Sequence, residues 1–509
     1  MLIHNFLENS ATRFPEKVAL ILSGKKITYS QLNRSADIFA NWFIKSGMQL
    51  GDRVLFLLEN GEEYVISYYA ALKAGLVVAP ISTETRSDAL YNILSTINPK
   101  VVIVSPKAEK AFHEITDPIS SLKTVIFINP KLSWQHRPFS TLLFNSLLDG
   151  EVSSPKLAFD NSSLASIIFT SGSTGKPKGV MLTHANIVAN THSIIQYLNL
   201  TEGDRQMVVL PLFYVMGKSL LNTHIAVSGS LVINNTFAYP ASVLKQMVDE
   251  NVTGFSGVPS TYAYLLHRSP LKSYKNKLPF LRYCSQAGGH MARKIKEELL
   301  EALPDHTKLY VMYGATEASA RLSYVEPARL RLKIDSIGVP IPGVTMRIVD
   351  PYGNELPVGK TGELIASGAN IMKGYWNDPE STLAAISHIG YHTGDLGYKD
   401  ADGYFYLVGR KDNQLKVGGH RINPQEVEDA LIATGLLIEV AVMGITDHLY
   451  GQKLVAIAVP INNEITEMDV IAKCIMFLPR YKVPSEITFV NMLPKNSSGK
   501  IDRQLLFSQ

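Results

Sequence analysis

The chain has 509 residues, of which 46% are hydrophobic, so it is too long for one domain and can bury several cores. Its net charge of +4 is small, and no basic stripe with interleaved aromatic residues argues for nucleic-acid binding. Two cysteines, Cys284 and Cys474, exclude a disulfide framework and favour free thiols. No signal peptide is recognised, and the most apolar stretch, 64–80, contains Lys73 and is too short to span a bilayer. We therefore expect a cytoplasmic protein.

The first part of the chain alternates helix-like and strand-like segments. Residues 28–47 carry apolar side chains at helical spacing and end on Gly47, which predicts a helix with a glycine at its carboxyl end. A second helix is expected through residues 69–73. Short apolar runs predict buried strands at 52–60, 76–80, 100–105 and 124–129. Strands that alternate with helices predict parallel sheets with helices on both faces.

Residues 170–179 read TSGSTGKPKG and directly follow the apolar run 164–170, which predicts a buried strand. Glycines let backbone amides converge on an anion, and the hydroxyls and lysines add hydrogen bonds and positive charge. The glycine spacing differs from that of a GxxxxGK[ST] P-loop. A flexible linker is the alternative, but it would rarely combine Gly with Thr, Lys and Pro directly after a strand. We predict a phosphate-binding loop made of Thr170, Ser171, Gly172, Ser173, Thr174, Gly175, Lys176 and Lys178.

The same alternation continues after this loop, with strands predicted at 205–212, 230–235, 252–259 and 308–314. Residues 338–368 are rich in Gly, Pro and short alternating runs, which indicates a small β-barrel or a distorted sheet. A helix opened by proline is expected at 424–434, followed by a short α/β tail. The charged cluster at 410–413 separates the two parts, so we predict domains at 1–410 and 411–509.

Four further motifs follow one another, each with a turn or loop that presents polar side chains. They are MYGATEAS with Thr316 and Glu317, YHTGDLG with Asp395, LVGRKDNQLKVGGHR with Arg410 and Asp412, and LPKNSSGKIDR with Lys500. Each residue alone has a structural explanation: a first-turn helix acid, a turn cap or a solvated lysine. Their joint occurrence in this order argues for one site.

With these motifs in this order, the chain resembles the adenylate-forming (AMP-binding) superfamily, of the acyl-CoA synthetase or acyl-AMP ligase type, over essentially its whole length. The resemblance implies an α/β fold, with a large amino-terminal domain of two parallel sheets and a small barrel and a mobile carboxy-terminal lid. It also implies that ATP and Mg²⁺ activate a carboxylic acid to an acyl-adenylate, which is then transferred to the pantetheine thiol of CoA or of a carrier protein.

The roles of single residues follow from the same resemblance. Lys500 and Thr316 would stabilise the reacting carboxylate and α-phosphate, and Glu317 would bind Mg²⁺. Asp395 and Arg410 would hold the ribose. The adenine would lie against Tyr313, Gly314, Gly288 and Gly289. Asp412 would be the hinge of a rotating carboxy-terminal domain, and Gly418 and Gly419 would line a narrow thiol tunnel.

The acyl pocket is expected to contain Tyr214, Val215, Met216, Lys218 and Val258. Relatives that activate amino acids carry an aspartate where this chain has Tyr214, which argues against an α-amino acid. Tyr214 is either a gate between the pocket and the thiol tunnel or an aromatic packing residue. Lys218 points either into the pocket, where it would pair with a second carboxylate or a polar substituent of the substrate, or outward into solvent, which we favour. We expect a short or medium carboxylic acid, which can carry a polar group.

The acceptor thiol is less well defined by the sequence. No extra segment is recognised between Ser336 and Gly394, where acyl-AMP ligases that load carrier proteins tend to carry an insertion. This favours CoA over a carrier protein. A luciferase-like oxidative enzyme and an inactive nucleotide-binding scaffold are the remaining alternatives, and the presence of all the motif residues argues against the second. The oligomeric state is not defined.

Overall fold

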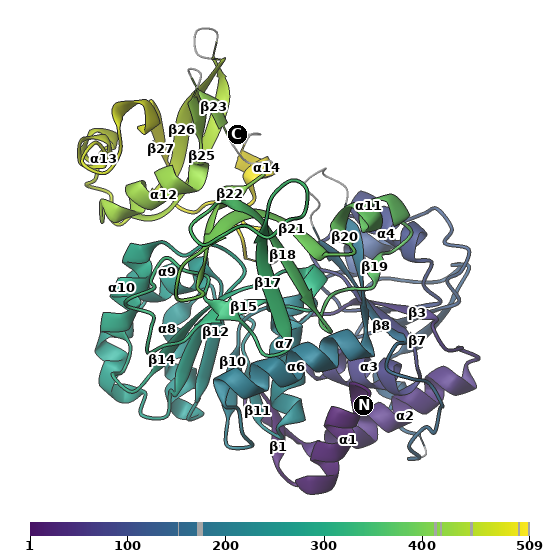
Figure 1. Cartoon of the computed structure of the whole chain (residues 1–509). Coiled ribbons are helices and arrows are strands. Elements are labelled where there is room, and N and C mark those ends of the chain that lie inside the picture. Colours follow the sequence, from purple (N-terminus) through teal and green to yellow (C-terminus); the bar gives the residue numbers. More distant parts are fainter. Residues whose placement is uncertain are drawn as a thin grey trace.

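The computed structural model describes residues 1–150, 152–170, 177–411, 415–417, 420–447, 451–496 and 499–506. Two large mixed sheets with helices on their faces form the main body, and a carboxy-terminal part lies above it in Figure 1. This α/β architecture confirms the predicted fold class.

The first large sheet has the strand order β19-β9-β8-β4-β3-β5-β6-β7. The strands from β8 to β7 run parallel, and β9 and β19 are antiparallel at one edge. The bounds are β3 (Arg53–Leu57), β4 (Val77–Pro80), β5 (Val101–Val104), β6 (Thr124–Phe127), β7 (Ser140–Leu143), β8 (Leu164–Thr170), β9 (Lys178–Thr183) and β19 (Gly374–Tyr375). The predicted strands thus occur in place, with ends that differ by a few residues.

The second large sheet has the order β16-β15-β14-β13-β12-β10-β11-β1-β2. The strands from β14 to β1 are parallel, and the outer strands are antiparallel. The bounds are β1 (Val18–Leu22), β2 (Lys25–Thr28), β10 (Arg205–Val208), β11 (Ser230–Ile233), β12 (Gly254–Gly257), β13 (Tyr283–Gln286), β14 (Lys308–Tyr313), β15 (Ser323–Val325) and β16 (Val339–Pro340). Ligands of such sheets bind beyond the carboxyl ends of the parallel strands.

Helices cover and separate the two sheets (Figure 1). They are α1 (His4–Arg13), α2 (Tyr29–Lys45), α3 (Glu62–Lys73), α4 (Ser87–Ile97), α5 (Glu109–His113), α6 (His184–Leu198), α7 (Val215–Ala226), α8 (Pro240–Asp249), α9 (Pro259–His267), α10 (Arg293–Ala302), α11 (Pro379–Ala385) and the short 3₁₀ helices η1 (Asn145–Leu147), η2 (Leu271–Lys277) and η3 (Thr316–Ala318).

Local chemistry explains where the predicted helix α2 starts and stops. The Thr28 hydroxyl accepts from the backbone N–H of Gln31, whose side chain accepts from the N–H of Thr28, so a capping box begins the helix. Gly47 follows the last turn with φ +81°, a conformation that glycine adopts without strain.

Helix α7 lies in the main core, between the two sheets. Its Leu221 and Ile225 belong to the same apolar cluster as Phe56 of one sheet and Leu231 of the other. Every residue from 215 to 225 is buried, so this helix has no solvent face.

Residues after Gly338 form the small antiparallel sheet of the prediction, a half-barrel with the order β17-β18-β21-β20 and with β22 paired to β21. Its strands are β17 (Val344–Val349), β18 (Gly362–Gly368), β20 (Ile386–Ser387), β21 (Gly390–Lys399) and β22 (Phe405–Arg410).

The carboxy-terminal part contains a ladder β25-β26-β27 and a hairpin of β23 and β24. Its elements are β23 (Leu415–Val417), β24 (His420–Ile422), α12 (Pro424–Ala433), β25 (Leu437–Asp447), β26 (Gly451–Pro460), α13 (Glu467–Cys474), η4 (Arg480–Lys482), β27 (Glu486–Phe489) and α14 (Arg503–Leu506). Strand β22 ends at Arg410, and the domain division at 410/411 stays a prediction.

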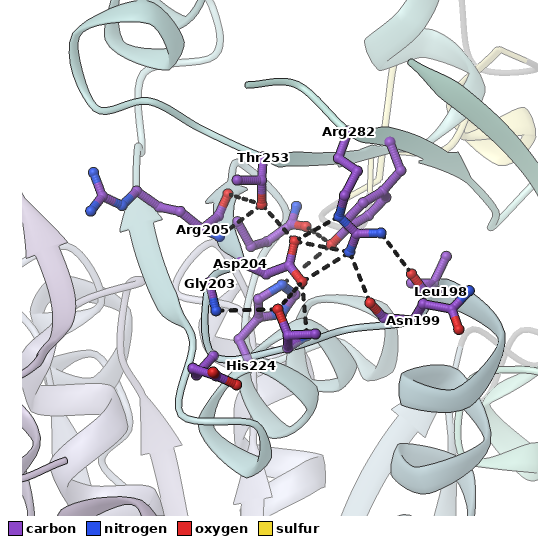
Figure 2. Close-up of polar contacts among 12 residues, drawn as sticks. Leu198, Asn199, Gly203, Asp204, Arg205, His224, Thr253 and Arg282 are labelled. Atoms are coloured by element: carbon purple, nitrogen blue, oxygen red, sulfur yellow. Dashed lines mark hydrogen bonds and ion pairs between the residues drawn. The ribbon is translucent and has the colours of Figure 1, made fainter. Parts of the chain in front are cut away.

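A polar network fixes the amino ends of three parallel strands (Figure 2). Asp204, which precedes β10, accepts from the guanidinium of Arg282 and from the Thr253 hydroxyl, and these two residues precede β13 and β12. Arg282 also donates to the carbonyls of Leu198 and Asn199 at the end of α6. A cation at a helix carboxyl end is favourable, so this arginine ties α6 to the sheet.

Within the described ranges, no helix combines the length and the apolar character needed to cross a membrane.

Candidate active site

The loop that carries Lys500 closes on itself before it reaches the main body. The backbone N–H of Asn496 donates to the carbonyl of Lys500, and the N–H of Lys500 donates to Oδ1 of Asn496 at 3.1 Å. Gly499 has φ +81°, and its carbonyl accepts from the Ser260 hydroxyl at 2.9 Å, on α9. Lys500 is therefore held against the main body by a docked loop.

The side chain of Lys500 points to the carboxyl ends of the second large sheet. Its Nζ lies 3.5 Å from the hydroxyl of Tyr214, at the start of α7. A Cβ placed on Gly288 would lie 3.1 Å from Cγ1 of Val258, 3.6 Å from Cε of Lys500 and 3.8 Å from Sδ of Met216. The structure thus brings five residues together. They are Tyr214 and Met216 at the start of α7, Val258 directly before α9, Gly288 in the loop after β13, and Lys500 in the loop before α14.

A tight turn after β14 presents Thr316 and Glu317. Gly314 is required there, because a Cβ on it would lie 2.0 Å from the carbonyl oxygen of Ala320. Ser319 and Ala320 have φ values of +56° and +123°, which L residues rarely adopt. Strain of this kind is kept only where the surroundings enforce it, and it clusters at functional sites.

Glu317 is oriented by a neighbour from the edge strand β19. Its Oε1 accepts from the hydroxyl of Tyr375 at 2.9 Å. Burial, and then the carboxylate of Glu317, raise the pKa of this tyrosine, so it stays a donor. The ammonium of Lys178 lies 5.1 Å from the centre of the same ring. One predicted phosphate-loop lysine therefore lies beside the predicted metal ligand.

Asp395 and Arg410 are direct partners in register on β21 and β22. The two side chains approach to 3.7 Å, and Asp395 also accepts a short hydrogen bond from the hydroxyl of Tyr313. Burial, and then the charge of Asp395, raise the pKa of Tyr313, which keeps the phenol protonated. A carboxylate oriented by a tyrosine and an arginine is suited to accept from a pair of sugar hydroxyls.

Part of the predicted site falls on residues outside the described ranges. The two ends of the predicted loop are described: Thr170 and Lys178 pair across the antiparallel strands β8 and β9. The predicted residues outside the description are Ser171, Gly172, Ser173, Thr174, Gly175, Lys176, Asp412, Gly418 and Gly419.

The residues predicted for the acyl pocket divide into two groups. Tyr214, Met216 and Val258 lie with Lys500, as described above. Val215 and Lys218 line a small separate cavity behind α7. A Cβ placed on Gly289 would lie 3.4 Å from Cγ of Pro259.

The favoured outward orientation of Lys218 is wrong. The residue is 2% exposed, its ammonium donates to Ser166 at 3.2 Å, and it lies 5.2 Å from the centre of the Tyr68 ring. The prediction assumed a helix with a solvent face, whereas α7 is buried on all sides. Within the described part of the chain no carboxylate pairs with this lysine, and burial lowers its pKa to about 7.

We expect Lys218→Met to raise the free energy of unfolding near pH 7 by about 2 kcal/mol, because a buried cation without a counter-charge opposes folding. The folded pKa is about 7 and the ordinary value is 10.5, so the unfolded chain binds the extra proton between these pH values. Stability of the parent protein should rise with pH through this window, and the variant should lose this dependence. Urea unfolding from pH 6.5 to 10 would measure it, with the exposed Lys473→Met as the control. An unchanged pH slope would contradict the expectation.

Sequence reasoning missed three positioning contacts. Tyr375 orients Glu317, and Ser260 docks the Lys500 loop. His290 lies 2.9 Å from Asp429 of α12 and joins the main body to the carboxy-terminal part across a cleft that Lys500 also lines. None of these pairs is close in sequence, so spacing along the chain held no signal for them.

Among the described residues, no cluster of three or more His, Cys, Asp or Glu side chains could hold a metal ion by itself. Glu317 is a single carboxylate. This donor set fits Mg²⁺, which commonly binds one or two carboxylates and takes its other ligands from phosphates and water.

Comparison with known proteins identifies the family of this chain. Residues 7–376 match the family described as AMP-binding enzyme, and residues 426–500 match the AMP-binding enzyme C-terminal domain. The chain is 31% identical to a long-chain-fatty-acid–CoA ligase of Bacillus subtilis (strain 168), over 100% of this chain and 94% of that protein. It is 30% identical to a feruloyl-CoA synthase of an Amycolatopsis species, over 96% and 94% of the two chains.

A solved structure shows the same fold. The crystal structure of ATP-bound MatB from Rhodopseudomonas palustris superposes with a TM-score of 0.86 at 27% identity, over 99% of this chain and 98% of that one. The protein therefore belongs to the AMP-binding enzyme family and is an AMP-forming acid–thiol ligase.

Proposed function

We propose that this protein uses ATP to convert a carboxylic acid to its acyl-adenylate and then transfers the acyl group to the thiol of CoA. The observation that carries the proposal is the position of Lys500. Its ammonium reaches Tyr214 at the carboxyl ends of the second large sheet, on the same side as Glu317. In a displacement at phosphorus, the protein contributes mainly by placing positive charge where negative charge develops in the transition state.

In the first step Lys500 stabilises negative charge on the carboxylate and the α-phosphate, and Thr316 lies in the same turn as Glu317. Glu317 provides the carboxylate for Mg²⁺, which when bound would neutralise phosphate charge. Asp395, held by Tyr313 and Arg410, accepts from the ribose hydroxyls of the nucleotide. Gly288 and Gly289 leave a surface without side chains for the adenine.

The second step is proposed to need a different orientation of the carboxy-terminal part, because Lys500 now lies beside Tyr214, where the thiol channel would have to open. Asp412 is proposed as the hinge, and Gly418 and Gly419 as the lining of the thiol channel. A turn of this part would break the contacts of Ser260 with Gly499 and of His290 with Asp429. These two contacts are polar, whereas Ala263 of α9 packs in one apolar cluster with Ile438 and Met443 of β25, which the turn would also have to separate.

The proposed acceptor is CoA, because the relatives described above are named CoA ligases. Their acids, a long-chain fatty acid and ferulate, differ too much for either to be assigned to this chain. A short or medium acid remains our proposal, with a cytoplasmic location.

The test is a pyrophosphate-release screen over a panel of carboxylic acids with ATP and Mg²⁺, each with and without CoA. We expect at least one acid to give rapid release only when CoA is present, and to yield its thioester. Adenylation without thioester formation would contradict CoA as the acceptor and would point to a carrier protein. No pyrophosphate release with any acid would contradict the proposed activity.

A further inference from the structure

Arg321 is a buried cation with no carboxylate partner within the described ranges. Arg321 is 2% exposed to solvent. Nε points to the sulfur of Met312 at 3.2 Å, and Nη1 donates to the carbonyl of Ala320 at 3.2 Å. A guanidinium has five N–H donors, and sulfur is a weak acceptor. The side chain of Arg321 also hydrogen-bonds Tyr197. Buried charges are normally paired, so among the described residues this arginine lacks the counter-charge that its position calls for.

Arg282 shows how the same fold treats another arginine of the same sheet. Its guanidinium makes a forked interaction with Asp204, and it also donates to the carbonyls of Leu198 and Asn199 at the end of α6 (Figure 2). This partly exposed structural arginine is thus supplied with a carboxylate. The absence of one at Arg321, among the described side chains, points to a counter-charge that comes from a ligand.

The surroundings of Arg321 connect it to the reacting centre. One apolar cluster contains Met312 and Tyr197 together with Met216 and Val258. Met312 and Tyr197 lie beside Arg321. Burial raises the pKa of Tyr197, and the positive charge of Arg321 partly offsets this rise. Met216 and Val258 lie beside Gly288 and Lys500. Lys500 and Arg321 therefore border one cluster from different sides.

The wall of this cluster is rich in tyrosine, and it is held rigidly. Tyr197 stacks on Tyr324 with ring centres 4.3 Å apart, and the hydroxyl of Tyr283 donates to Gln206 at 2.7 Å. Met216 lies beside Gly288 and Lys500, and Met312 lies beside Arg321. Unbranched side chains of this kind can change rotamer to admit a substrate.

The backbone of Arg321 is fixed as firmly as that of the catalytic turn. It follows the strained pair Ser319 and Ala320, and its carbonyl accepts from the side-chain amides of Asn190 and Asn370 at 3.0 and 2.9 Å. Glu317 and Arg321 are thus two ends of one rigid turn. A substrate placed for reaction beside Glu317 has a fixed relation to the guanidinium.

We propose that Arg321 binds a second carboxylate of the substrate, so that the preferred acids are dicarboxylic acids with one carboxylate at Lys500 and the other at Arg321. The inference rests on the proposed function and specifies its substrate class. A carboxylate matches the forked donors of arginine in two parallel hydrogen bonds. A monocarboxylic acid would leave the guanidinium desolvated and unpaired.

The experiment compares matched acids on the parent enzyme: glutaric with pentanoic acid, adipic with hexanoic acid, and phthalic with benzoic acid. The readout is kcat/KM for pyrophosphate release. We expect at least one diacid to exceed its partner by on the order of 100-fold, the effect of leaving one member of a buried charge pair alone. Arg321→Met should remove this preference, and Arg321→Lys should restore part of it.

Lys296→Met is the matched control, since Lys296 is also buried and donates to the carbonyl of Ile334 away from this cluster. It should leave the diacid-to-monoacid ratio unchanged. Binding of an ATP analogue would verify that each variant is folded. If Arg321→Met does not fold, the diacid-to-monoacid ratios of the parent enzyme decide the test by themselves. Preference for the monoacid in every pair, or an unchanged ratio in Arg321→Met, would overturn this inference alone. Failure of all acids would overturn the proposed function and the inference with it.

Discussion

Replacing Lys500 with alanine is expected to slow acyl-adenylate formation by on the order of 10²–10³-fold, the loss typical of removing one preorganised donor. The loop should keep its shape, because Asn496 holds it through backbone contacts that alanine retains. The substitution therefore removes the ammonium beside Tyr214 and little else. Single-turnover pyrophosphate release at saturating ATP and acid would measure the effect.

Two controls make this test specific. Lys473→Ala, on the exposed side of α13, should leave the rate unchanged. Thioester formation from a prepared acyl-adenylate and CoA should survive in Lys500→Ala, because the second step proceeds with this loop turned away. Retained adenylation in the variant would mean that another residue stabilises the developing charge.

The substitution Glu317→Gln is expected to lower the adenylation rate by on the order of 100-fold at millimolar Mg²⁺, and to raise the Mg²⁺ concentration needed for half-maximal rate. Glutamine keeps the size of the side chain and can still accept from the Tyr375 hydroxyl, so the change is mainly the loss of one negative charge. A Mg²⁺ titration of pyrophosphate release would separate weaker metal binding from a slower step.

Glu326→Gln provides the matched control, because Glu326 also accepts from a tyrosine hydroxyl, that of Tyr404, at 2.7 Å, outside the proposed site. Its Mg²⁺ dependence should equal that of the parent protein. If Glu317→Gln behaved in the same way, Glu317 would be a structural partner of Tyr375 and the metal would have another ligand.

The strands and several helices were predictable because their signals are local. The apolar run 164–170 is strand β8, and residues 28–47 contain α2 with its cap at Thr28. Periodicity and capping depend on neighbours within a few positions, which the sequence displays directly. Strand ends differ by a few residues, since pairing across the sheet decides where a strand stops.

Lys218 shows where such reasoning ends. Lysine on a helix is usually solvated, and the sequence around it has no feature that excludes this. Burial of α7 on all sides is a property of the two sheets that enclose it, so only their packing reveals that the ammonium is buried. Arg321 is a second case, because the absence of a carboxylate beside it, among the described residues, is visible only when its neighbours in space are known.

The sequence by itself determined the order of the motifs, the α/β class and the residue types that a phosphoryl-transfer site needs, because each is encoded in short contiguous segments. The tertiary structure alone decided which of these residues meet. It brought Lys500 to Tyr214 and Gly288, set Tyr375 against Glu317, and left Arg321 buried beside Met312. The contacts of Lys500 and of Tyr375 join segments separated by tens to hundreds of residues, whereas Arg321 and Met312 are nine positions apart. They arise when the parallel strands bring their carboxyl ends to one edge and the last loop docks there, which no local pattern specifies.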